Sequence, residues 1–150
     1  MIGISSKYRA SMLALVAASL STGCSAPAAP GLEATADACV QRVLAADDVL
    51  GSSRNFAPEL APIHEAVRAY ADALEDLDYA GCPTAFVEAY RAHVAAWRAS
   101  MPLLRRHAAR RGEMHELFKT IANDPEGQDL PAYEAVIWKT WAEVERAAQD

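Results

Sequence analysis

Residues 63–77 read Ile-His-Glu-Ala-Val-Arg-Ala-Tyr-Ala-Asp-Ala-Leu-Glu-Asp-Leu, and their apolar positions indicate the fold class. These positions follow one another at intervals of four, three, four and three residues: Ile63, Val67, Tyr70, Leu74 and Leu77. An α-helix brings residues at such intervals onto one face, whereas a half-buried strand would show strict alternation. The stretch therefore predicts an amphipathic helix that buries its apolar face against other helices.

Helical periodicity continues on both sides of this stretch. Further helical segments are predicted over residues 34–50, 84–101, 103–111, 114–121 and 131–148. Gly51-Ser52-Ser53 is expected to stop the first helix, Gly81 to cap the helix over 63–77, and Pro102 to bend or break the third. Alanine is frequent and no strand pattern is present, so we expect an all-α fold: a four- to five-helix, mostly antiparallel bundle.

The first residues of the chain have the features of a secretory signal. Lys7 and Arg9 precede an uncharged stretch over residues 10–23. A basic start, an apolar middle and small residues before a cleavage site are typical of such signals. The apolar stretch is too short to span a bilayer comfortably, which takes roughly 20 residues.

The run Leu20-Ser21-Thr22-Gly23-Cys24 ends this signal and resembles the lipobox of bacterial lipoproteins. The resemblance implies that Cys24 is lipidated, with palmitate among its acyl chains, and becomes the first residue of the mature protein. Because Ser25 follows instead of Asp, it also implies the outer membrane, facing the periplasm. An ordinary cleaved signal with a free Cys24 and a short membrane anchor are the alternatives.

Three regions follow from these patterns. Residues 1–23 form the signal peptide, and residues 24–33 form the lipidated Cys with a flexible tether rich in Ala and Pro. Residues 34–150 form the helical-bundle domain. One domain of this size can bury a substantial core.

With Cys24 assigned to the lipid, Cys39 and Cys82 remain as an even pair in an oxidising compartment. We predict a disulfide between them. Short connections make neighbouring helices antiparallel, which places both residues at the same end of the bundle. Two buried thiols or a pair of metal ligands are the alternatives, and neither Cys has the close Cys or His neighbour of a zinc site.

The charge of the mature chain limits the classes of partner that it is expected to bind. Without Lys7 and Arg9, 12 basic and 20 acidic side chains leave a net charge of −8. An acidic domain is a poor ligand for nucleic acid and is not attracted by anionic membranes. Contact with the membrane is therefore expected through the lipid anchor, and no nucleic-acid partner is expected.

Tyr90, His93 and Trp97 share one face of the third helix and form a candidate pocket. His93 could act there as a base or ligand, or could hydrogen-bond a neighbour inside the core. On paper, a b-type haem could use His93 with Met101 or Met114, although methionines at helical spacing usually pack in the core. The four His lie on different segments without a zinc motif, so no metal and no cofactor are expected.

Two surface patches are candidates for partner binding. The cluster of Arg105, Arg106, Arg110 and Arg111 could bind an anion or an acidic partner, or could be a solvated helix end. Arg106 and Arg110, four residues apart, are expected to share a helix face. Tyr133 and Trp138 form a second candidate patch, because Trp138 lies beside the apolar stripe of its helix and exposed aromatic residues are enriched in interfaces.

The sequence contains no GxSxG motif, no HExxH motif and no recognisable catalytic constellation. The stretch Cys-Pro-x-x-Phe-x-x-Ala-Tyr-x-x-His-x-x-Ala-Trp at residues 82–97 resembles small uncharacterised bacterial helical proteins, which implies no function. We expect a non-enzymatic, periplasm-facing binding module with a possible protein partner. The alternatives are an immunity-type inhibitor of a toxin or cell-wall hydrolase, and a small-ligand carrier or enzyme with its pocket at His93.

Overall fold

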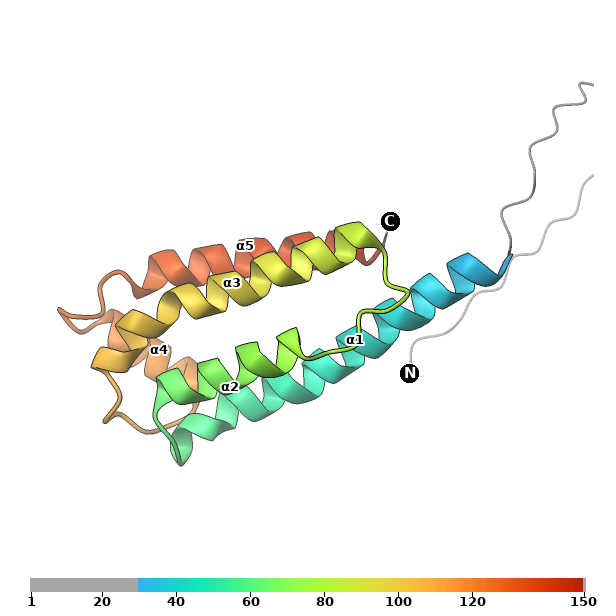
Figure 1. The fold of residues 1–150 in the computed structure, drawn as a ribbon. Coiled ribbons are helices and arrows are strands. Elements are labelled where there is room, and N and C mark those ends of the chain that lie inside the picture. The colour runs from blue at the N-terminus through green and yellow to red at the C-terminus, as the bar shows by residue number, and fades with distance from the viewer. Residues whose placement is uncertain (1–29, 150) are drawn as a thin grey trace, which may run out of the picture.

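A computed structural model describes residues 30–149 of the chain. The predicted signal peptide and the predicted lipidation site Cys24 lie outside these residues. The described part contains no strand, and its helices are α1 (Pro30–Phe56), the 3-10 helix η1 (Ala57–Glu59), α2 (Ile63–Glu75), α3 (Thr84–Arg106), α4 (Met114–Ala122) and α5 (Leu130–Ala147) (Figure 1). The predicted all-α bundle is confirmed.

The long helices run up and down beside one another. α2 returns antiparallel to α1, α3 packs along both α2 and α5, and α4 forms a short segment at one end (Figure 1). The start of α1 and the end of α5 lie at the opposite end of the bundle from α4. Short connections account for this order, since they leave little chain for a crossover.

The core forms where the apolar stripes of the helices meet. On α2, Ile63, Val67 and Leu74 have no exposed surface, as the 4-3-4-3 spacing predicts. They face α3, where Phe86 and Tyr90 are also fully buried and their rings meet edge to face at 5.0 Å. Such aromatic pairs contribute beyond their buried area, so this pair stabilises the buried face of α3.

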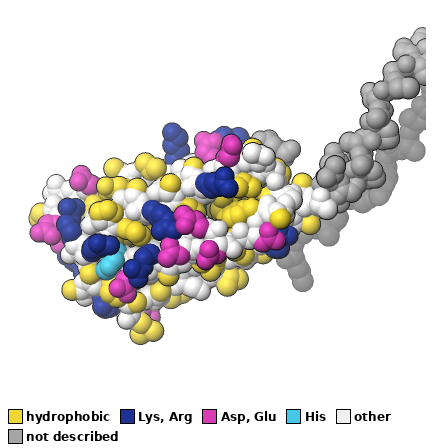
Figure 2. All heavy atoms as spheres, viewed as in Figure 1, with side chains coloured by type: hydrophobic (Ala, Val, Ile, Leu, Met, Phe, Trp, Pro, Cys, Tyr) yellow, Lys and Arg dark blue, Asp and Glu magenta, His cyan; other side chains and the backbone are white. Residues whose placement is uncertain are grey.

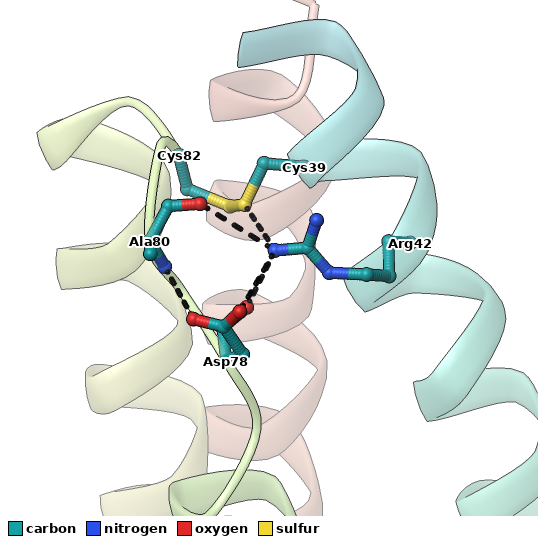
Figure 3. Close-up of a disulfide and its surroundings, with 5 residues drawn as sticks. All are labelled: Cys39, Arg42, Asp78, Ala80 and Cys82. Carbon is teal, nitrogen blue, oxygen red and sulfur yellow. Dashed lines mark hydrogen bonds and ion pairs between the residues drawn. A yellow bond between two sulfur atoms is a disulfide. The ribbon is translucent and has the colours of Figure 1, made fainter. Parts of the chain in front are cut away.

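The predicted disulfide between Cys39 and Cys82 is confirmed, with the two Cα atoms 5.1 Å apart. It ties α1 to the connection between α2 and α3. Arg42 reaches over from α1 and donates hydrogen bonds from Nη2 to the carbonyl oxygens of Asp78 at 2.9 Å and Ala80 at 3.5 Å (Figure 3). Gly81 in this connection has φ of 85°, a conformation that favours glycine.

The predicted end of the first helix is wrong, because α1 continues through Gly51-Ser52-Ser53 to Phe56. A glycine inside a helix costs only about 1 kcal/mol relative to alanine, which packing can outweigh. Here the last turns of α1 carry Arg54 onto two aromatic rings, and the following Pro58 is buried. At its other end α1 begins at Pro30, so the first turn covers residues 30–33 of the expected tether.

Two further boundaries differ from expectation, at the ends of α2 and α3. α2 ends at Glu75, so Gly81 lies in the connection and does not cap the helix. Of the bend or break expected at Pro102, the structure excludes the break, because α3 continues through this exposed residue. α3 then ends at Arg106, because the next residues turn with Arg110 N–H donating to the carbonyl of His107.

The surface of the domain mixes charges of both signs with apolar side chains, as one face shows (Figure 2). Arg98 on α3, for example, pairs with Asp72 at 2.7 Å and with Glu75 at 2.6 Å on α2. Within residues 30–149, none of the helices combines the length and the hydrophobicity that crossing a bilayer requires.

Candidate functional site

The described domain has a cavity of about 670 Å³ between α1 and α5. These two helices make few backbone contacts with each other, whereas α3 packs closely on α5 and α2 packs on α1. The following residues line the cavity: Leu44, Asp47, Asp48, Gly51, Ser52, Arg54 and Asn55 of α1, Tyr70 of α2, His93 and Trp97 of α3, Glu113 with Met114, His115 and Phe118 of α4, and Glu134, Ile137, Trp138 and Trp141 of α5. Side chains from every α-helix therefore contribute to one site.

A buried carboxylate lies at the inner wall of this cavity. Asp47 is 5% exposed and accepts hydrogen bonds from the hydroxyl groups of Tyr70 at 2.6 Å and Tyr90 at 3.0 Å. Burial, followed by the charge of Asp47, raises the pKa of both tyrosines well above the usual value. The two hydroxyls therefore stay protonated and keep donating, which fixes the position of Asp47 and of the middle of α1.

Arg54 lies two turns further along α1, on the same wall. Its guanidinium carbon is 4.5 Å from the centre of the Tyr70 ring and 4.3 Å from that of Trp97. Burial lowers the pKa of Arg54 from its usual value, while Tyr70 and Asp47 act in the opposite direction. An arginine remains charged at neutral pH, so the cavity wall holds a partly desolvated cation that two aromatic faces stabilise.

His93 is 3% exposed and both of its ring nitrogens are engaged. Nε2 accepts the indole N–H of Trp97 at 3.0 Å, so in the neutral ring Nδ1 carries the proton and donates to Thr140 Oγ1 at 3.0 Å. Burial lowers the pKa of His93 to about 4. The ring is therefore neutral at physiological pH and has no nitrogen free for a substrate.

The opposite wall of the cavity is aromatic. Trp141 packs its ring 5.4 Å from that of His93, and Trp138 beside it is 66% exposed. Phe118 and Met114 of α4 are buried and close one end. Flat apolar side chains on two sides are typical of sites for small organic molecules.

Acidic side chains are grouped around the opening. Asp48 is exposed and Glu134 is partly buried. Glu113 uses its carboxylate to cap α4, accepting the N–H of Glu116 at 3.2 Å. These three residues, called the acidic rim below, add negative charge to the cavity lining, and of the charged lining residues Arg54 is partly buried, as Glu113 and Glu134 are.

The predicted pocket of Tyr90, His93 and Trp97 lies partly in this cavity. His93 and Trp97 line it, whereas Tyr90 is fully buried behind it and reaches it only through Asp47. In the second aromatic patch, Trp138 lies at the cavity mouth, and Tyr133 packs partly buried against the core without lining the cavity. The predicted pocket and the predicted aromatic patch therefore both lie at or beside the same cavity.

The basic cluster lies elsewhere, at the end of the bundle near α4. Arg106 and Arg110 do not share a helix face, because α3 ends between them, yet both contact the connection before α5. Arg106 donates to the carbonyl of Glu126 at 3.0 Å, and Arg110 pairs with Asp124. Arg105 and Arg111 are exposed at the end of this segment.

A smaller hollow of about 430 Å³ lies between Arg106 and Arg110 on one side and residues 124–126 on the other. His107, which is 5% exposed, lines it, and its Nε2 has no hydrogen-bond partner. Carboxylate and carbonyl groups of the same connection already engage the neighbouring guanidinium groups. This arrangement fastens the connection to the end of α3.

Asp47 and Arg54 are the site residues that sequence reasoning missed. Their signal is the spacing of α1, in which Val40, Val43, Asp47, Leu50 and Arg54 recur at intervals of three and four. A charged residue in an apolar stripe points inward, where it needs a partner. The expectation that the helix ends at Gly51 hid the position of Arg54, whereas Asp47 lies within the predicted helix and was overlooked.

No family model matches the chain, and neither a curated protein nor a solved structure matches it. In the described part of the chain, no group of three or more His, Cys, Asp and Glu side chains has the arrangement of a metal site. The function must therefore be inferred from the cavity itself.

Proposed function

We propose that this chain is a non-enzymatic binding module of the bacterial envelope that holds a small organic ligand in the cavity between α1 and α5. The observation that carries this proposal is the cavity of about 670 Å³ with its aromatic walls. Pockets for small molecules measure about 300–1,000 Å³ and combine apolar walls with a few placed polar groups. Asp47 and Arg54 supply those polar groups here.

The state of His93 favours binding over catalysis. A general base needs a free nitrogen within reach of its substrate and a pKa near the working pH. In this site Trp97 and Thr140 occupy both nitrogens, and burial lowers the pKa of His93 to about 4. His93 therefore serves to orient Trp97 and α5 around the cavity.

The envelope location rests on the lipobox resemblance at Cys24. Five residues, 25–29, separate Cys24 from the start of α1, and they can reach at most about 18 Å. A lipid on Cys24 would hold the cavity close to the membrane surface, which we propose is the periplasmic face of the outer membrane. Growth with an alkyne-tagged palmitate should label the wild-type protein and leave Cys24→Ser unlabelled; labelling of both proteins would contradict the anchor.

Filling the cavity tests the proposed binding function. Ser52 and Ser53 are both exposed, but Ser52 lines the cavity, whereas Ser53 does not and donates to the carbonyl of Val49 at 3.0 Å. The full-length protein, with its disulfide intact, should bind the neutral aromatic probe 2-naphthamide saturably in a calorimetric titration. Ser52→Trp should abolish binding because the indole occupies the space, and the matched control Ser53→Trp should retain it. Equal binding by both variants would place the probe elsewhere.

Protein binding is a second candidate function, favoured by exposed apolar groups on α5. Trp138 is 66% exposed and Val136 is 50% exposed. A protein partner, such as a toxin or a cell-wall hydrolase neutralised by an immunity-type inhibitor, could bury both side chains. In a muramidase inhibition assay this function predicts stoichiometric inhibition by the wild-type protein and its loss in Trp138→Ala. If the wild-type protein does not reduce the activity of the muramidase, it is not an inhibitor of that enzyme.

A further inference from the structure

We infer that the ligand of the cavity carries a carboxylate or a comparable oxyanion, which binds the guanidinium of Arg54 while its apolar body lies against Trp138 and Trp141. This inference rests on the proposed function and specifies the class of ligand.

The first support is that Arg54 has no anionic partner. None of the ion pairs within 4.0 Å among the described residues involves Arg54. Its Nε and Nη2 donate to the side-chain oxygen of Asn55 at 3.3 Å and 3.0 Å, which is a neutral acceptor. Asp47 acts on this cation electrostatically but forms no ion pair with it, so an anion that enters the cavity can still form the direct, hydrogen-bonded pair that Arg54 lacks.

The second support is the position of the guanidinium in the cavity wall. Nε and Nη2 both donate to the one side-chain oxygen of Asn55, and Tyr70 provides a further side-chain hydrogen bond to Arg54. Nη1 does not take part in the bonds to Asn55, and Arg54 lines the cavity. A planar guanidinium presents its N–H groups in a fork that matches an oxyanion.

The two aromatic rings hold this group in place before a ligand arrives. The guanidinium lies over both Tyr70 and Trp97, and the two rings are themselves edge to face at 5.6 Å. The indole of Trp97 is fixed in turn by its hydrogen bond to His93. A preorganised donor loses little side-chain entropy on binding, which increases affinity for an anion.

The negative charges of the acidic rim would favour a cationic ligand, so their electrostatic effect on a ligand must be compared with that of Arg54. Asp48 is exposed, and Glu113 is engaged as the cap of α4. Charges in contact with water are screened at physiological salt, whereas a charge inside the bundle acts through a lower dielectric. Asp47 acts on Arg54 electrostatically without forming an ion pair, and its carboxylate already accepts hydrogen bonds from two tyrosine hydroxyls. Arg54 therefore determines the ligand charge inside the cavity, and the rim slows the entry of anions.

The experiment compares three probes of one shape and different charge: 2-naphthoate, the neutral 2-naphthamide and cationic 2-naphthylmethylammonium. Each is titrated into the full-length protein in its oxidised form, and affinity is measured by calorimetry. We expect naphthoate to bind about tenfold or more tightly than the amide, as a hydrogen-bonded charge interaction would give. The ammonium compound should bind most weakly.

Variants connect this preference to Arg54. In Arg54→Gln, naphthoate should lose its advantage and the amide should bind as in the wild type. Arg54→Met keeps the apolar packing on Tyr70 and Trp97, so it provides a second test if the glutamine variant does not fold. Arg98→Gln removes a guanidinium that is paired with Asp72 and Glu75 on the surface, and it should leave all three affinities unchanged.

The outcomes separate the inference from the proposed function. Equal affinities for the three probes, or tightest binding of the ammonium compound, would overturn the anionic ligand while leaving a binding cavity. The same holds if naphthoate keeps its advantage in both Arg54 variants. Binding of none of the probes would contradict the proposed function itself.

Discussion

The two ends of α1 are held in different ways. Near its start, the disulfide from Cys39 and the hydrogen bonds of Arg42 fasten the helix to the connection between α2 and α3. Towards its end, α1 is separated from α5 by the cavity, and Asp47 and Arg54 are its main polar contacts. One region is closed covalently, whereas the other keeps a space that packing has not filled.

This difference shows how a small bundle can retain an open site. An unfilled space normally costs stability, because the surrounding side chains lose contacts. A covalent link at one end and a buried carboxylate with two hydroxyl donors in the middle limit how far α1 can collapse onto α5. The disulfide region therefore stabilises the fold, whereas the cavity region provides the space for a ligand.

Removing the disulfide should have the largest effect on stability. The bridge joins residues separated by 43 positions. Cross-linking a loop of this length restricts the unfolded chain, so Cys39→Ser together with Cys82→Ser should lower the free energy of unfolding by about 4 kcal/mol. Urea denaturation measures the change, with the reduced wild-type protein as comparison. A loss below about 1 kcal/mol would mean that the disulfide end does not hold α1.

Replacing the buried carboxylate should have the next largest effect. Asp47→Ala leaves the hydroxyls of Tyr70 and Tyr90 without their acceptor, which should cost about 3 kcal/mol. The neighbouring Asp48 is exposed, and Asp48→Ala provides the matched control with an expected change within about 0.5 kcal/mol. Urea denaturation of the two variants gives both values. Similar losses in both would show that Asp47 does not act as an internal anchor.

Acid should weaken the cavity region through His93. Burial lowers the pKa of His93 from 6.5 to about 4, so the unfolded chain binds a proton more readily than the folded one between these values. Neutral, buried His93 therefore makes its full contribution to stability above pH 6.5, and this contribution is lost as the pH falls towards 4. The contribution of His93 to this loss should be about 2 kcal/mol between pH 7 and pH 5.

The control isolates His93 from the carboxylates that also titrate. The difference in unfolding free energy between pH 7 and pH 5 should be smaller by about 2 kcal/mol in His93→Gln than in the wild type. His115 lines the same cavity but is exposed, and His115→Gln should behave as the wild type does. An unchanged pH dependence in His93→Gln would indicate that the histidine titrates normally in the folded protein.

The smallest effect concerns the polar contacts beside the disulfide. Arg42 is exposed and donates to the carbonyls of Asp78 and Ala80, so Arg42→Ala should cost at most about 1 kcal/mol. In a protein without the disulfide, Arg42→Ala should lower the free energy of unfolding by less, because the connection between α2 and α3 is then free to move. A thermodynamic cycle from four urea curves measures this coupling, and a larger cost of Arg42→Ala without the disulfide would reverse the predicted sign.

The sequence predicted the fold well where periodicity alone determines structure. The stripe of Ile63, Val67 and Leu74 is buried, and antiparallel packing brings Cys39 and Cys82 together as expected. The site was harder to predict, because Arg54 lies beyond the expected end of the first helix and Asp47, inside it, is of a residue type that usually faces solvent. Their partners Tyr70, Tyr90 and Trp97 come from two other helices, and no local pattern indicates such contacts.

The central claim is that the open end of the bundle binds a ligand while the disulfide end does not. Nuclear magnetic resonance of side-chain N–H groups tests it directly, with 2-naphthoate titrated into the ¹⁵N-labelled, oxidised full-length protein. The account predicts saturable shifts of the indole N–H of Trp138 and Trp141 and of Arg54 Nε–H, with Arg42 Nε–H unchanged. Shifts confined to Arg42, or no saturable shift of the three cavity groups, would contradict it.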